Sequence, residues 1–120
     1  MARDLIHILG PLFLPAASSE RSGAWQPALD IYQARDGWLL KADLAGVRPA
    51  DIIVLVEDRR LTIRGMRRDW CLEEGCCHYR MEIAYSHFER TVELPDDLSR
   101  ADVTSEYRDG MLLVRVRKGK

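Results

Sequence analysis

The stretch "ALDIYQARDGWLLKADL" (residues 28–44) has the pattern of a β-hairpin. Two runs, 28–34 and 38–44, flank Arg35-Asp36-Gly37, and glycine suits the positive φ that a tight turn requires. In the second run the apolar residues Trp38, Leu40, Ala42 and Leu44 alternate with Lys41 and Asp43. A period of two places the apolar side chains on one face of a strand. We therefore predict two antiparallel strands that cover one core.

The same pattern continues along the chain, with turn residues every 8–12 positions. Further strands are predicted at 52–57, 60–65, 86–94, 102–107 and 111–116. The run Ile52–Glu57 is apolar on both faces, and no segment sustains a helical period of 3.6. These features predict an all-β fold, an immunoglobulin-like β-sandwich.

The chain of 120 residues is long enough for one domain and divides into three parts. We expect an apolar N-terminal arm at 1–24, the sandwich at 25–117 and a C-terminal stub at 118–120. Within the sandwich, the connection 66–84 is much longer than a hairpin loop, and long loops are usually functional. We predict that this loop crosses to a second chain and that Trp70, Tyr79 and Arg90 lie at the dimer interface.

Arg90 is singled out because it shares strand parity with Phe88, Val92 and Leu94. A charge on an apolar face needs a partner, or its burial costs several kcal/mol. Either the strand twist carries Arg90 to the rim, or it meets a carboxylate near an interface; the second is favoured because guanidinium suits bidentate pairing.

Composition excludes several classes of protein. A net charge of −1 and a pI of about 6.3 argue against a nucleic-acid or anionic-membrane binder. No apolar run approaches the length of a membrane span. Residues 1–15 include an apolar stretch, but His7, Gly10 and Pro11 interrupt it, so a secretion signal is disfavoured. The three cysteines, all within 71–77, make a poor disulfide framework and favour a cytoplasmic location.

We find no catalytic or nucleotide-binding motif, and we therefore expect neither an enzyme nor a cofactor. Asp96-Asp97 is interpreted as a solvated turn. Cys71, Cys76, Cys77 and His78 carry zinc-like ligand types, but no second ligand pair accompanies them. Oxidative cross-linking of two chains through these thiols is a second possibility. The favoured interpretation is that they are small apolar fillers in a packing loop.

Across 25–118 the sequence resembles the α-crystallin domain of small heat-shock proteins, the Hsp20 family. The resemblance is carried by "PALDIYQARDGWLLKADLAGVRPADIIVLVEDRRLTIRG" (27–65), "YSHFERTVELP" (85–95) and "VTSEYRDGMLLVRVRK" (103–118). The order and spacing of all three blocks agree with the family. Departures include Ala45 in place of a usual proline, Ser105 in place of alanine and Arg117 in place of the proline before Lys118.

The resemblance implies an ATP-independent holdase chaperone, which binds partly unfolded proteins and suppresses their aggregation. It also implies a homodimer or small oligomer formed by exchange of the loop strand, with no nucleic-acid or membrane partner. A p23-like co-chaperone that binds a specific folded partner remains the alternative. A thiol or metal regulatory protein built on Cys71–His78 is a third interpretation.

The family commonly carries an Ile-x-Ile/Val tail that docks into a groove of a neighbouring dimer, whereas the present sequence ends at Lys120. We expect the N-terminal arm to take this place through Ile6 and Ile8, which are spaced to share one face of an extended segment. The predicted groove residues are Ile52, Val54, Val56 and Thr104. Arm residues expected to contact clients are Leu5, Ile6, Ile8, Leu12 and Phe13. The alternative is a loose arm that only touches clients.

Overall fold

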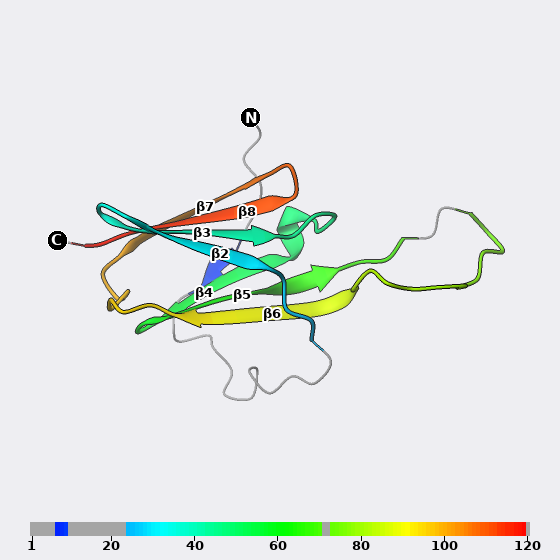
Figure 1. Cartoon of the computed structure of the whole chain (residues 1–120), viewed down its shortest axis with the longest axis horizontal. Helices are drawn as coiled ribbons and strands as arrows, with labels where there is room; N and C mark the ends of the chain where they lie inside the picture. Colours follow the sequence, from blue (N-terminus) through cyan, green and yellow to red (C-terminus); the bar gives the residue numbers. More distant parts are fainter. Residues whose placement is uncertain (1–6, 10–23, 71–72, 120) are drawn as a thin grey trace.

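The computed structural model describes residues 7–9, 24–70 and 73–119, and it is a sandwich of two four-stranded sheets (Figure 1). The first sheet has the order β1 (His7–Leu9), β4 (Ile52–Glu57), β5 (Arg60–Arg67) and β6 (Ser86–Glu93). The second has the order β2 (Leu29–Ala34), β3 (Gly37–Asp43), β8 (Met111–Arg117) and β7 (Asp102–Arg108). The predicted all-β sandwich is confirmed.

The predicted strands agree with β2 to β8 to within two residues at each end. Of the pairings between the described strands, that of β1 with β4 is parallel and the others are antiparallel. A 3₁₀ turn, η3 (Pro49–Asp51), lies in the connection from β3 to β4. Among the described residues, no helix is long and apolar enough to cross a membrane.

The core lies between the sheets and follows from strand alternation. Leu40 and Ala42 of β3 are fully buried, as are Ile52 and Val54 of β4. The same core cluster contains Leu61, Ile63, Phe88, Leu112, Val114 and Val116. Each such aliphatic or aromatic side chain contributes about 1.5–3 kcal/mol on burial, so this set supplies most of the driving force for folding.

A clasp joins the end of β3 to the β7–β8 hairpin. The Leu44 amide donates to the Gly110 carbonyl at 2.8 Å, and the Tyr107 hydroxyl donates to the Leu44 carbonyl at 2.7 Å. Gly110 has φ of 80°, and a side chain there would press on Ala45. Glycine in the Asp109-Gly110 turn therefore serves both the turn and the close approach of the β3–β4 connection.

Asp96 anchors the opposite end of the second sheet. Its carboxylate accepts a hydrogen bond from the Trp38 indole at 2.8 Å and lies 3.5 Å from the Lys118 ammonium. These contacts, the indole first, lower the pKa of Asp96. Asp97 instead accepts a bond from the Ser99 amide at 3.0 Å. The two carboxylates thus hold a turn, and Asp96 is more firmly bonded than a solvated turn residue.

We predict that Gly65→Ala destabilises the fold by about 2–3 kcal/mol, as overpacking of a core does. Gly65 lies in β5, where an added Cβ would overlap the Asp51 carbonyl and come within 2.8 Å of the Phe88 ring. Urea denaturation measures the loss. Gly75→Ala is the control, because a Cβ there meets nothing within 4 Å and only the φ of 81° opposes the change. This conformational cost should destabilise the fold by about 1 kcal/mol. Equal effects of the two substitutions would contradict the steric account.

Candidate interaction surfaces

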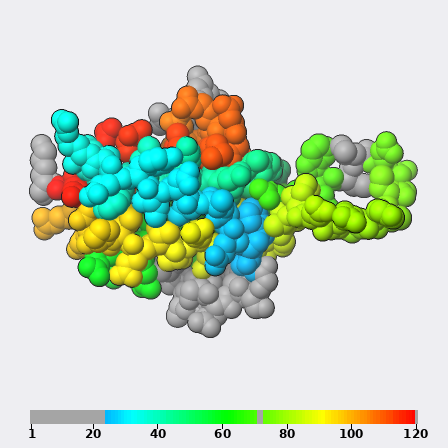
Figure 2. Space-filling view, in the orientation of Figure 1, coloured from blue at the N-terminus to red at the C-terminus, as the bar shows by residue number. Residues whose placement is uncertain are grey.

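The connection between β5 and β6 extends beyond the sandwich, as Figure 2 shows. Its first limb follows β5, and its second limb leads into β6. Large apolar side chains on it are exposed: Trp70 by 72%, Tyr79 by 100%, Met81 by 50% and Ile83 by 62%. Exposed apolar side chains gathered in one segment mark an interaction surface. Trp70 and Tyr79 were predicted from the sequence to lie at an interface, and the structure exposes both.

Met81 and Ile83 were missed by the sequence analysis. Tyr79, Met81 and Ile83 alternate with Arg80 and Glu82, which is the period of a strand. In the described part of the chain, this segment is paired with no strand. The alternation itself was the signal that would have found the two residues.

The base of the loop is held by Arg67. Its guanidinium donates to the carbonyls of Ala45 at 3.0 Å and Ala84 at 2.9 Å, and so ties the second limb of the loop to the β3–β4 connection. It also stacks on the Trp25 ring, 4.4 Å from the ring centre. The backbone of Trp25 exchanges hydrogen bonds with His87 and Glu89 along β6. The loop therefore leaves the sandwich from a fixed base.

Asp51 fixes the first limb. Its carboxylate accepts two hydrogen bonds from Arg68, at 2.9 and 3.1 Å, and one from Arg48 at 3.2 Å. The bonds from Arg68 lower the pKa of Asp51 most, partial burial opposes them, and Arg48 lowers the pKa further. A bidentate guanidinium–carboxylate pair has a defined geometry, so it orients the chain just where the loop begins.

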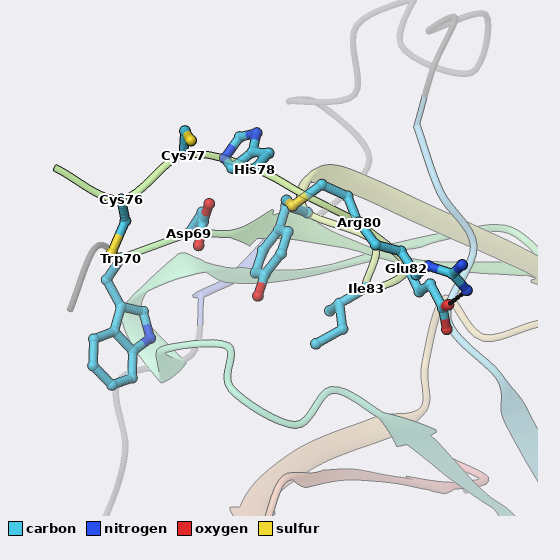
Figure 3. Close-up of a pocket in the computed structure, with 10 residues that line it drawn as sticks. Asp69, Trp70, Cys76, Cys77, His78, Arg80, Glu82 and Ile83 are labelled. Atoms are coloured by element: carbon cyan, nitrogen blue, oxygen red, sulfur yellow. Dashed lines mark hydrogen bonds and ion pairs between the residues drawn. The ribbon is translucent and has the colours of Figure 1, made fainter. Parts of the chain in front are cut away.

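The two limbs enclose an open hollow of about 590 Å³, shown in Figure 3. Cys76 and Cys77 line it and are exposed and free, whereas Cys71 lies outside the described residues. In Figure 3 the Cys76 side chain points toward Trp70, and Cys77 lies on the other side of the chain beside His78. No group of three metal-ligating side chains occurs among the residues that the structure describes. Cross-linking through these thiols stays a prediction.

Arg90 has the predicted parity, since it lies opposite the buried Ile63. Its partner differs from the expected carboxylate: the guanidinium donates to the Pro27 carbonyl at 2.9 Å. The reason is that residues 25–27 run beside β6, through a bridge between Trp25 and Phe88, and bring this carbonyl within reach of Arg90.

The predicted groove residues differ in how far the structure buries them. Ile52 and Val54 are fully buried core residues and do not line an open groove, because their parity turns them toward the facing sheet. Val56 is half-buried, and Thr104 is exposed on β7, the outer strand of the second sheet. Part of the arm pairs with β4: His7 lies opposite Ile53, Ile8 opposite Val54 and Leu9 opposite Leu55. Leu5, Ile6, Leu12 and Phe13 lie outside the described residues.

Among the strands that the structure describes, the outer strand β2 borders only β3. Residues 30–34 of β2 are all exposed, including Ile31 by 42% and Tyr32 by 46%. Within the described residues, the second sheet therefore presents an open backbone edge flanked by apolar side chains, which is a typical site for addition of another strand.

Comparison with known proteins agrees with this architecture. The model of the Hsp20/alpha crystallin family matches residues 30–120. The chain belongs to this family. It is 28% identical over 102 residues to "Spore protein SP21" of Stigmatella aurantiaca, with 85% of this chain and 60% of that protein covered. It is 38% identical over 92 residues to the "19.0 kDa class II heat shock protein" of rice, Oryza sativa, with 72% and 53% covered.

A solved structure gives the same result. The crystal structure of hspA from Xanthomonas axonopodis superposes with a TM-score of 0.65 at 34% identity, covering 78% of this chain and 94% of that one. The predicted family is confirmed, and membership supports a chaperone role. The chain spans about half to three-fifths of the length of the two curated relatives named above.

We predict that Asp51→Asn lowers stability at neutral pH but not in acid. Because the pKa of Asp51 is lowered in the folded protein from its usual 3.8, its contribution is present above that value and is lost as the pH falls through the folded pKa. The difference in free energy of unfolding between wild type and variant should therefore be constant above about pH 5 and should shrink toward zero as the pH falls below about 4. Urea denaturation across pH measures it. Asp69→Asn, on the exposed loop, should follow the wild type; a gap for Asp51→Asn that persists in strong acid would contradict the ion-pair account.

Proposed function

We propose that this protein is an ATP-independent holdase, which binds partly unfolded proteins and prevents their aggregation. The observation that carries the proposal is the exposed, alternately apolar segment 79–83, which has no strand partner among the described residues, in a chaperone-family fold. Such surfaces recognise apolar side chains and free backbone rather than one folded shape. The free thiols Cys76 and Cys77 suit a reducing compartment, and we place the activity in the cytoplasm.

The proposed unit is a homodimer in which each loop adds to the partner's β2. Segment 79–83 has the strand pattern but no strand partner in the described part of its own chain, and β2 has a free edge with Ile31 and Tyr32 exposed. If each copy both gives a loop and receives one, the contact is two-fold symmetric and closes at two chains. Trp70 and Tyr79 then lose their exposure to solvent at the interface.

Arg90 connects the two parts of the chain that this arrangement uses. By bonding the Pro27 carbonyl it holds β6 to the segment that leads into β2, whose first residue is Leu29. The same side chain thus links the strand that follows the donated loop to the strand that receives the partner's loop. We assign Arg90 a positioning role at the dimer interface.

The holdase proposal is tested with citrate synthase aggregating on heating, followed by light scattering. We predict that equimolar protein suppresses the scattering and that added ATP changes nothing, since the sequence holds no nucleotide-binding motif. Undiminished scattering, or suppression only with ATP, would reject the proposal. Tight binding of one folded protein without suppression would favour the p23-like alternative.

The dimer is tested with Met81→Asp combined with Ile83→Asp. We predict that the wild type sediments at twice the chain mass of 13.8 kDa and the variant at the mass of one chain, because charges would replace the buried apolar contacts. Arg80→Ser with Glu82→Ser, on the other parity of the same segment, is the matched control and should remain dimeric. Deletion of 70–80 should also give monomers. A dimer of normal stability in the double aspartate variant or in the deletion variant would contradict the loop-exchange model.

A further inference from the structure

Two adjacent thiols of the loop between β5 and β6 lie in different surroundings. Cys76 and Cys77 are both exposed and free. In Figure 3 the Cys76 side chain points toward Trp70, whereas Cys77 lies on the other side of the chain beside His78. Both residues lie outside the strands that the structure describes. Chemical change at either sulfur therefore leaves the sandwich in place, and exposed thiols are open to such change.

The hollow beside Cys76 has the size and the lining of a small-molecule site. Its volume is about 590 Å³, within the range of roughly 300–1,000 Å³ for pockets that hold small ligands. Trp70 and Met81 contribute apolar surface to its lining. Arg80 and Glu82, which form an ion pair at 3.3 Å, contribute charges of both signs. A small peptide, which carries carboxylates and an ammonium group, has the matching charges.

The hollow belongs to the part of the loop that the proposed dimer buries. Trp70 and Met81 line the hollow, and both are large apolar side chains that are exposed in the single chain. When the loop packs on β2 of a second copy, a charged group held in the hollow would lose its water, which is costly unless the group finds a partner. A ligand in the hollow and the second copy therefore exclude each other, and each weakens the binding of the other by the same factor.

We infer that Cys76 is a modification site, at which a low-molecular-weight peptide thiol is attached as a mixed disulfide that keeps the chain monomeric. The inference rests on the proposed loop-exchange dimer and adds its regulation. The oxidant is the disulfide form of the small thiol. The Cys76 thiolate attacks one of its sulfurs, a new S–S bond forms as the old one breaks, and the departing thiolate takes up the proton that Cys76 released. Excess reduced thiol reverses the exchange and restores the dimer.

The modification links self-association to the redox state around the protein. In a reducing solution Cys76 is a free thiol, and the loops can pair with β2 of a second copy. When the small disulfide accumulates, it reacts with the fraction of chains that have dissociated and withdraws them from the dimer by mass action. The modified chains keep both segment 79–83 and the edge of β2 exposed. Oxidation then increases the apolar surface that the protein offers, without unfolding the sandwich.

Single-cysteine variants test the inference. Cys71→Ser with Cys77→Ser leaves Cys76, and Cys71→Ser with Cys76→Ser leaves Cys77 as the matched control. Each variant is treated with oxidised glutathione, the adduct is verified by intact mass, and the dissociation constant of the dimer is measured by sedimentation equilibrium. We expect the adduct at Cys76 to raise this constant roughly tenfold or more, because its charges oppose burial of the loop. Dithiothreitol should restore the original constant.

The adduct at Cys77 should leave the dissociation constant unchanged, because that side chain lies on the other side of the chain. Methyl methanethiosulfonate, which adds only an uncharged S-methyl group, should leave the dimer intact even at Cys76. A fully modified Cys76 variant that stays dimeric would overturn the inference, and so would equal dissociation by the adduct at Cys77 or by the S-methyl group. Reduced protein that is monomeric from the start would instead reject the loop-exchange dimer, so the two failures are distinct.

Discussion

The pairing of strand edges is the constraint on which the rest of this structure depends. An edge strand leaves a row of backbone donors and acceptors that attract another strand. In the first sheet, β1 pairs with the edge of β4, and the backbone of Trp25 bonds to the edge of β6. In the second sheet, β2 and β7 are the outer strands, and the exposed apolar side chains Ile31 and Tyr32 gather on β2. Two short segments before β2 thus cover one sheet, while the other keeps an edge that suits a second copy.

The loop between β5 and β6 and the N-terminal arm are proposed to act at different sheets. The loop begins at a base fixed by Asp51 and Arg67, and its exposed face alternates like a strand. The arm strand pairs with β4, in the other sheet from β2. The proposed self-association through the loop and β2 would therefore leave the pairing along β4 unchanged. Because these edges belong to different sheets, substitutions at one are expected to leave the other intact.

The strands and turns could be predicted well because the patterns that indicate them depend only on neighbouring residues. Alternation in 28–44 and the Asp109-Gly110 turn depend on neighbours along the chain, and the structure has two strands within 28–44 and a turn at Asp109-Gly110. The run Ile52–Val56, apolar on both faces, was interpreted as a groove wall, but Ile52 and Val54 belong to the core. The partners of long-range contacts were not predictable. Arg90 was known to need one, yet nothing local indicated the Pro27 carbonyl, 63 residues away.

Hydrogen exchange of segment 79–83 and β2, measured by mass spectrometry in the wild type and in the Met81→Asp, Ile83→Asp variant, tests the central claim most directly. If sheet edges are the working surfaces, both segments should exchange more slowly in the wild type, because each gains a strand partner from the second copy. Exchange in 52–57 should be the same in both proteins, because that strand pairs within the other sheet. A wild-type dimer in which 29–34 and 79–83 exchange as fast as in the variant would contradict the account.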